Sequence, residues 1–198
     1  MQSVGLFGGS FDPVHLGHLL VAQAALDELG LDRLFFIPAA QSPFKPHDQP
    51  ASGAVRLRLL RLALAGHTRC EIDDREIRRG GVSYTVDTLR AYVDQFPGAQ
   101  LFYLIGADHA AKLNEWREPA ELARLAEFVV VPRPGGAPAA FAPPFRGRLL
   151  KGIPCGLSSS EIRARVGAGR PIDTLVPAAA AGAIYAEGLY RRPATSGT

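Results

Sequence analysis

The chain of 198 residues is 47% hydrophobic and 21% charged, with a net charge of +3, which is typical of one soluble globular domain. No apolar run is long enough to cross a membrane, no signal peptide is evident, and the two cysteines have neither disulfide-framework nor zinc spacing. We therefore expect a cytoplasmic chain that binds no membrane. The mild positive charge favours anionic partners, but no basic run or basic–aromatic interleaving indicates nucleic acid.

The first predicted element is a strand at residues 4–7. A glycine turn and the start of a helix follow it, over residues 8–18. Gly8 and Gly9 are expected to form the turn, because glycine bends tightly and lets a ligand approach the backbone. Asp12 is a good N-cap, and Pro13 suits the first helical position. The unpaired N–H groups at such a helix start predict an anion site.

Two histidines follow at the start of this expected helix. His15 and His18 are three residues apart, so their side chains would share one face of its first turn. Each feature alone fits an ordinary surface turn. Together, and in this order, they predict a site for phosphate chemistry.

Apolar runs predict the remaining strands, at residues 34–37, 70–72, 101–105, 128–131 and 149–150. Helical spacing and capping signals predict helices at 14–29, 54–65 and 86–96, from 119, from 158, and at 178–189. A strand, a crossover helix and a strand form a βαβ unit, so the sheet should be parallel. We expect a Rossmann-like α/β fold, an open parallel sheet with helices on both faces, in a single domain over residues 1–190. Residues 191–198 are expected to be a disordered tail.

Some polar segments have a purely structural interpretation. Residues 73–81 indicate a charged loop, and Arg56 belongs to an arginine-rich helix side that we expect to be solvated. Ser83 and Thr85 are expected to supply capping hydroxyls for the helix that follows them.

Three later stretches carry candidate binding residues. Gly106 and Asp108 follow the most apolar strand, where a carboxylate suits ribose hydroxyls. Trp116, the only tryptophan, lies in a polar loop and offers a flat face for stacking. Serines 158–160 at a helix start, with Arg163 one turn later, describe a second anion site. A parallel sheet could bring both anion sites to the same edge.

The chemistry that remains is direct phosphoryl or nucleotidyl transfer, because no activated nucleophile or Walker sequence is present. In such a transfer the protein positions two substrates in line and stabilises charge on phosphorus. The natural charge stabilisers are His15, His18, Lys45 and Arg163. Lys45 lies in residues 39–52, a loop expected at a ligand-binding strand end. We expect no metal-ligating side chains, and Mg²⁺ bound through the substrate phosphates.

These stretches resemble known sequences. GSFDPVHLGH at 9–18 resembles the opening motif of the H-x-G-H nucleotidyltransferases, and SSSEIR at 158–163 is similar to their C-terminal serine-rich motif. Three more stretches are similar to bacterial nicotinate mononucleotide adenylyltransferases: GVSYTVDTL at 81–89, LIGAD at 104–108 leading to Trp116, and FVVVPRPG at 128–135. The resemblance runs from about residue 4 to about residue 190.

The resemblance implies transfer of AMP from ATP to nicotinate mononucleotide, by direct in-line attack without a covalent intermediate. The products would be deamido-NAD and pyrophosphate, in NAD biosynthesis. It implies catalytic roles for His15, His18, Lys45 and Arg163. The implied ATP-binding residues are Gly8, Gly9, Ser10, Phe11, His15, His18, Gly106, Asp108, Ser158, Ser159 and Arg163. The implied mononucleotide-binding residues are Lys45, Thr85, Trp116 and Arg133, with the indole stacking on the pyridine ring.

Two departures and several alternatives stay open. Phe44 stands where the family usually has a histidine, and Ser160 replaces a commoner threonine. The acceptor could be nicotinamide mononucleotide or phosphopantetheine, or the chain could be a nucleotide-binding module without activity. An RNA-binding protein would need a basic patch that the sequence lacks. The residues leave open whether the chain forms a homo-oligomer.

Overall fold

The computed structural model describes residues 1–44, 49–131, 134–135 and 141–191. Among these residues, parallel strands form one six-stranded sheet in the order β3-β2-β1-β4-β5-β6. The strands are β1 (Ser3–Gly9), β2 (Arg33–Pro38), β3 (Cys70–Ile72), β4 (Gln100–Gly106), β5 (Glu127–Val131) and β6 (Gly147–Leu149). Every predicted strand is therefore present, and the prediction of a parallel Rossmann-like sheet is confirmed.

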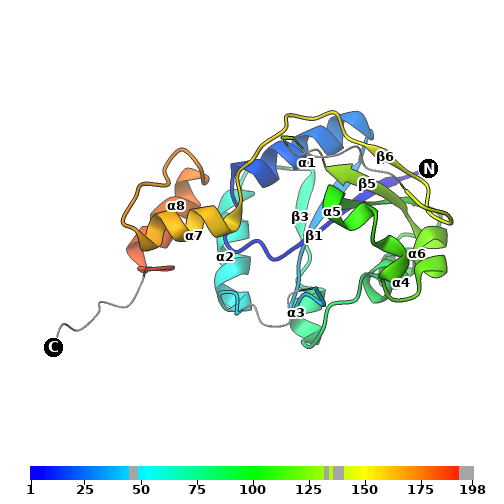
Figure 1. Ribbon diagram of the computed structural model, residues 1–198, viewed down its shortest axis with the longest axis horizontal. Helices are drawn as coiled ribbons and strands as arrows, with labels where there is room; N and C mark the ends of the chain where they lie inside the picture. Colours follow the sequence, from blue (N-terminus) through cyan, green and yellow to red (C-terminus); the bar gives the residue numbers. More distant parts are fainter. Residues whose placement is uncertain (45–48, 132–133, 136–140, 192–198) are drawn as a thin grey trace.

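Helices cover both faces of this sheet (Figure 1). They are α1 (Leu16–Glu28), α2 (Gly53–Ala63), α3 (Arg75–Arg79), α4 (Thr85–Gln95), α5 (Ala107–Ala110), α6 (Pro119–Leu125), α7 (Ser159–Gly167) and α8 (Ala178–Ala186), with a 3-10 turn at Leu113–Glu115. Side chains of a strand alternate between its two faces, and β2 illustrates the result. Leu34 and Phe36 pack into the core shared with α1, α2, α7 and α8, whereas Phe35 and Ile37 pack into the core shared with α4, α5 and α6.

The helices α7 and α8 lie together at one end of the molecule, beside α2 (Figure 1). Of residues 191–198, expected to be a disordered tail, 192–198 lie outside the described residues. Within the described part of the chain, no helix has the length and apolar character needed to cross a bilayer.

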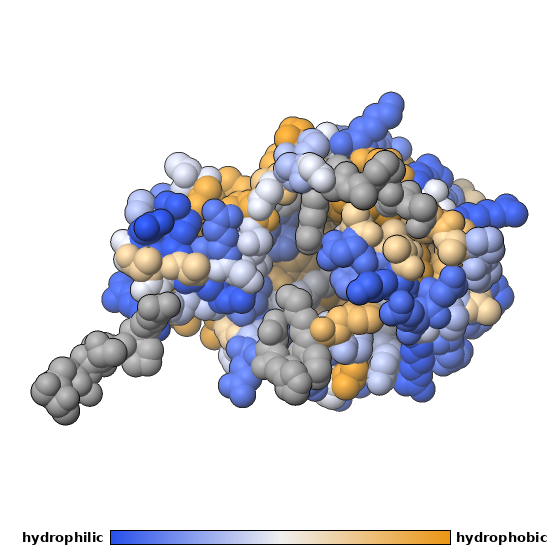
Figure 2. Space-filling model, in the orientation of Figure 1, coloured by the Kyte–Doolittle hydropathy of each residue, from blue (hydrophilic) through white to orange (hydrophobic). Residues whose placement is uncertain are grey.

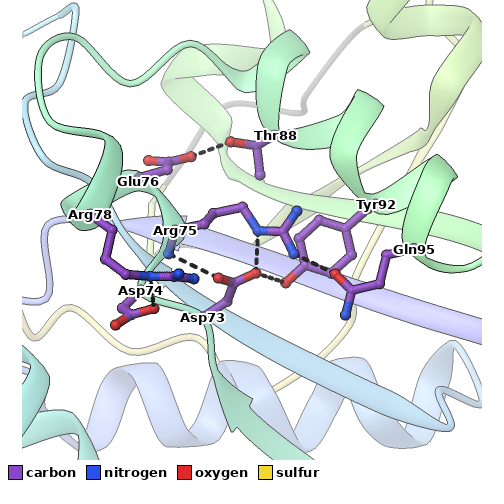
Figure 3. A network of polar contacts seen from close by, with 8 residues as sticks. All are labelled: Asp73, Asp74, Arg75, Glu76, Arg78, Thr88, Tyr92 and Gln95. Carbon is purple, nitrogen blue, oxygen red and sulfur yellow. Dashed lines mark hydrogen bonds and ion pairs between the residues drawn. The ribbon is translucent and has the colours of Figure 1, made fainter.

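The expectation of a charged loop at residues 73–81 is wrong, because α3 occupies its middle. A network of polar contacts holds this helix against α4 (Figure 3). Asp73 accepts a hydrogen bond from the Tyr92 hydroxyl at 2.7 Å and pairs with Arg75. Glu76 is only 4% exposed and accepts a hydrogen bond from Thr88 Oγ1 at 2.6 Å. Asp73, Arg75 and Glu76 thus face partners on α4, which a local pattern cannot reveal.

Candidate active site

The candidate site lies where the strand order reverses, between β1 and β4, which is where open α/β sheets bind ligands. A cleft of about 1270 Å³ opens at the carboxyl ends of these strands. The space-filling view is hollowed at this place, between the α7–α8 end of the molecule and α5 (Figure 2). Within the described residues, the sequence-predicted site residues all line this cleft: Gly8, Gly9, Ser10, Phe11, His15, His18, Thr85, Gly106, Asp108, Trp116, Ser158, Ser159 and Arg163. Lys45 and Arg133 lie outside the described residues.

The first turn differs from the prediction. Gly8 and Gly9 belong to β1, and the chain reverses after them, with Phe11 in the left-handed region at φ 48°. Helix α1 begins at Leu16 with His15 as its N-cap, so the predicted N-cap role of Asp12 is wrong. Asp12 is buried and its side chain accepts a hydrogen bond from Tyr190 instead. Asp12 thus lies three residues before the actual N-cap, and Pro13 is not the first helical residue.

The glycine at position 8 leaves room for a tyrosine from β4. A Cβ atom on Gly8 would lie 2.3 Å from Tyr103 Oη and 3.2 Å from Tyr103 Cζ. Tyr103 Oη also accepts a hydrogen bond of 3.4 Å from Thr85 Oγ1. Gly8 thus permits close packing between β1, Tyr103 of β4 and the start of α4.

We expect Gly8→Ala to lower the free energy of unfolding by about 2 kcal/mol, because overpacking a rigid site costs roughly 1–3 kcal/mol. In the Gly8→Ala/Tyr103→Phe double variant, the hydroxyl that clashes is gone and much of the loss should be recovered. Urea unfolding of the wild type, both single variants and the double variant measures this coupling. If the free energy lost in the double variant equals the sum of the losses in the two single variants, the explanation is wrong.

The two histidines stack against one another at the start of α1. Their ring centroids are 3.8 Å apart with an interplanar angle of 29°. His18 Nδ1 accepts a hydrogen bond of 3.1 Å from the backbone N–H of His15. The predicted proximity of the pair holds, although only His18 lies within the helix. Phe11, an expected ATP-binding residue, is buried and packs edge-on against His18, 4.9 Å between centroids.

Both imidazoles are neutral at pH 7 in the ligand-free protein. Burial lowers the pKa of His15 to about 4, and burial together with the neighbouring His15 lowers the pKa of His18 well below its usual range. Because Nδ1 of neutral His18 accepts a hydrogen bond, its proton is on Nε2. The His18 ring therefore offers the cleft a hydrogen-bond donor rather than a full positive charge.

The buried histidines predict that stability falls as the solution becomes acidic. The unfolded chain binds a proton on His15 near pH 6.5, whereas the folded chain does so only near pH 4. The stability that depends on a neutral His15 should be fully present well above pH 6.5 and should be lost as the pH falls toward 4, with a loss of about 2 kcal/mol between pH 7 and pH 5. Urea unfolding across this range should show a shallower slope for His15→Asn. The matched variant of the exposed His67, His67→Asn, should keep the wild-type slope.

The second predicted anion site joins the first. Ser158 caps α7 by accepting a hydrogen bond of 3.2 Å from the backbone N–H of Glu161, as expected. Ser159 Oγ donates to the backbone oxygen of Pro13 at 2.9 Å, and Arg163 Nη1 donates to that of Asp12 at 2.6 Å. The N-termini of α1 and α7 therefore meet at one edge of the cleft, as the parallel sheet allowed.

Arg56 also lines the cleft, at a position for which the sequence pattern gave the wrong environment. We expected it on a solvated helix side, yet it is only 2% exposed. Its guanidinium donates to the backbone oxygens of Ser10 at 2.9 Å, Ala39 at 2.8 Å and Ala51 at 2.9 Å. Arg56 thus ties the turn after β1 to the segment between β2 and α2. The spacing of the arginines on their helix carried no signal of these contacts.

The other end of the cleft is aromatic. Trp116 is partly buried, and its ring lies 5.4 Å from that of Phe44, 5.7 Å from that of His109 and 6.4 Å from that of Tyr103, between centroids. Thr85 is the first residue of α4, and Ser83 Oγ accepts from the backbone N–H of Ala40. The predicted capping role of these two hydroxyls is therefore wrong, because tertiary contacts engage both. The flat face of Trp116 and the N–H groups at the start of α4 suit a planar anionic ring.

Gly106 and Asp108 also line the cleft. Gly106 ends β4 and precedes α5, which carries Asp108. A carboxylate here accepts two hydrogen bonds, as a ribose offers. Within the described residues, no group of three or more histidine, cysteine or acidic side chains is arranged to hold a metal ion.

Comparisons with known proteins agree with this geometry. Residues 6–165 match the model of the cytidylyltransferase-like family. The chain is 42% identical to a probable nicotinate-nucleotide adenylyltransferase of Opitutus terrae, over 96% of this chain and 98% of that protein. It is 40% identical to a protein of the same description from Rhodopirellula baltica, over 96% and 94%. The solved nicotinic acid mononucleotide adenylyltransferase of Plasmodium falciparum, in complexes with APC and with NaAD, shares the fold. Its TM-score is 0.76 in both, at 16% and 18% identity, covering 96% of this chain and 98% of that one.

Proposed function

The chain belongs to the cytidylyltransferase-like family and, within it, to the nicotinate-nucleotide adenylyltransferases; on this premise we propose that it transfers AMP from ATP to nicotinate mononucleotide. The products are deamido-NAD and pyrophosphate. The observation that carries the proposal is that two helix N-termini with Arg163 and a histidine pair share one cleft with the aromatic cluster at Trp116.

The phosphate end of the cleft suits ATP. The N–H groups at the starts of α1 and α7 and the Arg163 guanidinium favour a polyphosphate. Gly8, Gly9, Ser10 and Phe11 shape the turn, Ser158 and Ser159 flank the phosphates, and Gly106 and Asp108 face the adenosine. Bound phosphate raises the pKa of both histidines toward protonation, because an opposite charge favours the charged imidazole.

The aromatic end suits the mononucleotide. The pyridine ring stacks on Trp116, and its carboxylate lies at the start of α4 near Thr85. Lys45 and Arg133, by resemblance to the family, hold phosphate groups. Phe44, 46% exposed beside Trp116, borders this end in place of the histidine that is usual in the family.

The reaction needs no covalent intermediate with the protein. A phosphate oxygen of the mononucleotide attacks the α-phosphorus of ATP, and the bond from that phosphorus to the bridging oxygen breaks. Pyrophosphate leaves with the electron pair. Mg²⁺, bound by the ATP phosphates, supplies further neutralisation of their charge. His15, His18, Lys45 and Arg163 orient the phosphates and stabilise the charge that develops in the transition state.

Pyrophosphate release tests the proposal, with ATP, Mg²⁺ and one acceptor at a time: nicotinate mononucleotide, nicotinamide mononucleotide or phosphopantetheine. We expect the highest kcat/KM with nicotinate mononucleotide. Release with phosphopantetheine alone would replace the proposed acceptor. The absence of release with all three, together with intact ATP binding, would indicate a nucleotide-binding module without this activity.

A further inference from the structure

A buried carboxylate at the phosphate end of the cleft has no role in the reaction described so far. Asp12 is 4% exposed and lies in the turn between β1 and α1. Its Oδ1 accepts a hydrogen bond of 2.7 Å from the Tyr190 hydroxyl, and its Oδ2 lies 3.7 Å from Arg163 Nη1. Residues from the two ends of the chain therefore meet on one carboxylate.

Arg163 is the cationic member of this group. Nη1 donates to the Asp12 backbone oxygen at 2.6 Å, and Nη2 donates to Ser160 Oγ at 3.2 Å. The hydrogen bonds within the described residues thus use two of the five guanidinium N–H groups. Its side chain is 36% exposed and lines the cleft, so the others are available to phosphate oxygens. Arg163 therefore meets Asp12 through both its backbone oxygen and its carboxylate.

Tyr190 is held from the side of α8. The backbone N–H of Leu189 donates to the oxygen of Ile184 at 3.0 Å, which closes the end of that helix. Glu187 pairs with Arg58 of α2 at the same end. Tyr190 itself lies in the left-handed region, at φ 62°, and lines the cleft. Burial and the neighbouring Asp12 raise the pKa of Tyr190, so its hydroxyl stays protonated and donates.

We propose that Tyr190 is a positioning residue for ATP binding: its hydroxyl fixes the Asp12 carboxylate, which fixes the Arg163 guanidinium toward the phosphates. The inference rests on the proposed function only in taking ATP as the ligand of this end. The segment after α8 thereby completes the phosphate site from a place far from both sequence motifs. An arginine that is already held in place loses less side-chain entropy when it binds a phosphate, so fixing the Arg163 guanidinium strengthens its charged hydrogen bonds to ATP.

The test is the affinity for α,β-methylene-ATP, measured by calorimetry without any acceptor. Tyr190→Phe removes one hydroxyl and keeps the ring, and we expect its Kd to rise about tenfold, as for loss of a charge-assisted contact. Tyr185→Phe is the matched control on the same side of the molecule. The Tyr185 hydroxyl accepts from the backbone N–H of Ile172 and donates to Asp173, so like Tyr190 it binds an aspartate. Tyr185 does not line the cleft. Its Kd should stay within twofold of wild type.

The route through the guanidinium is tested in an Arg163→Met background. There, Tyr190→Phe should change Kd by less than twofold, since the group that it positions is gone. A full effect in that background, an unchanged Kd for Tyr190→Phe alone, or an equal rise for Tyr185→Phe would each overturn the proposal. Because the analogue needs no acceptor, these results do not depend on whether nicotinate mononucleotide is the true acceptor.

Discussion

His18→Ala is expected to lower kcat at least ~100-fold, the loss that follows removal of one preorganised donor at a reacting phosphate. The ring lines the cleft at the N-terminus of α1. The hydrogen bond to its Nδ1 fixes the tautomer that presents Nε2–H, so alanine removes a donor whose orientation is already set. The initial rate of pyrophosphate release at saturating ATP and nicotinate mononucleotide measures the change.

The stack of His18 on His15 and its contact with Phe11 mean that alanine also removes packing. Urea unfolding of the same preparation establishes that the variant is folded under the assay conditions. His67→Ala, at an exposed histidine, should turn over at the wild-type rate. Turnover of His18→Ala within a few-fold of wild type would exclude the catalytic role.

Elements that depend on local sequence patterns could be predicted from the sequence. The alternating or continuous apolar runs predicted each strand, and the serines at α7 predicted a capped helix whose Ser158 does cap it. The parallel order of the strands then brought the two predicted anion sites, at the starts of α1 and α7, to one edge of the cleft.

Polar residues whose partners lie far along the chain differ from what their local sequence predicts. Asp12 looks like an N-cap, but its carboxylate binds Tyr190, 178 residues away. Arg56 looks like surface, but it bonds backbone oxygens of two other segments. Ser83 looks like a cap, but it accepts from the N–H of Ala40. Capping and solvation rules describe a side chain without tertiary competitors, and each of these side chains has one.

Arg56→Met should lower the free energy of unfolding by about 3 kcal/mol, because each buried carbonyl left without its donor costs roughly 1–3 kcal/mol and cleft water recovers part of it. Methionine keeps the apolar stem and removes the planar fork. Arg56→Lys restores a cation but not the fork, and one ammonium cannot reproduce the spread of the guanidinium donors. We therefore expect the lysine variant to lie between methionine and the wild type in urea unfolding.

Arg61→Met is the matched control, because Arg61 lies on the same helix and is exposed. Its stability should stay within about 0.5 kcal/mol of the wild type, as for most surface substitutions. Arg56 bonds the oxygen of Ser10 in the turn after β1, for which we propose a role in ATP binding, so Arg56→Met should also weaken binding of α,β-methylene-ATP at temperatures where the variant is folded. Equal stability for the two methionine variants would mean that the backbone oxygens of Ser10, Ala39 and Ala51 do not depend on the guanidinium. The turn after β1 would then be held by its own packing, through Phe11 in the core, rather than by an arginine from α2.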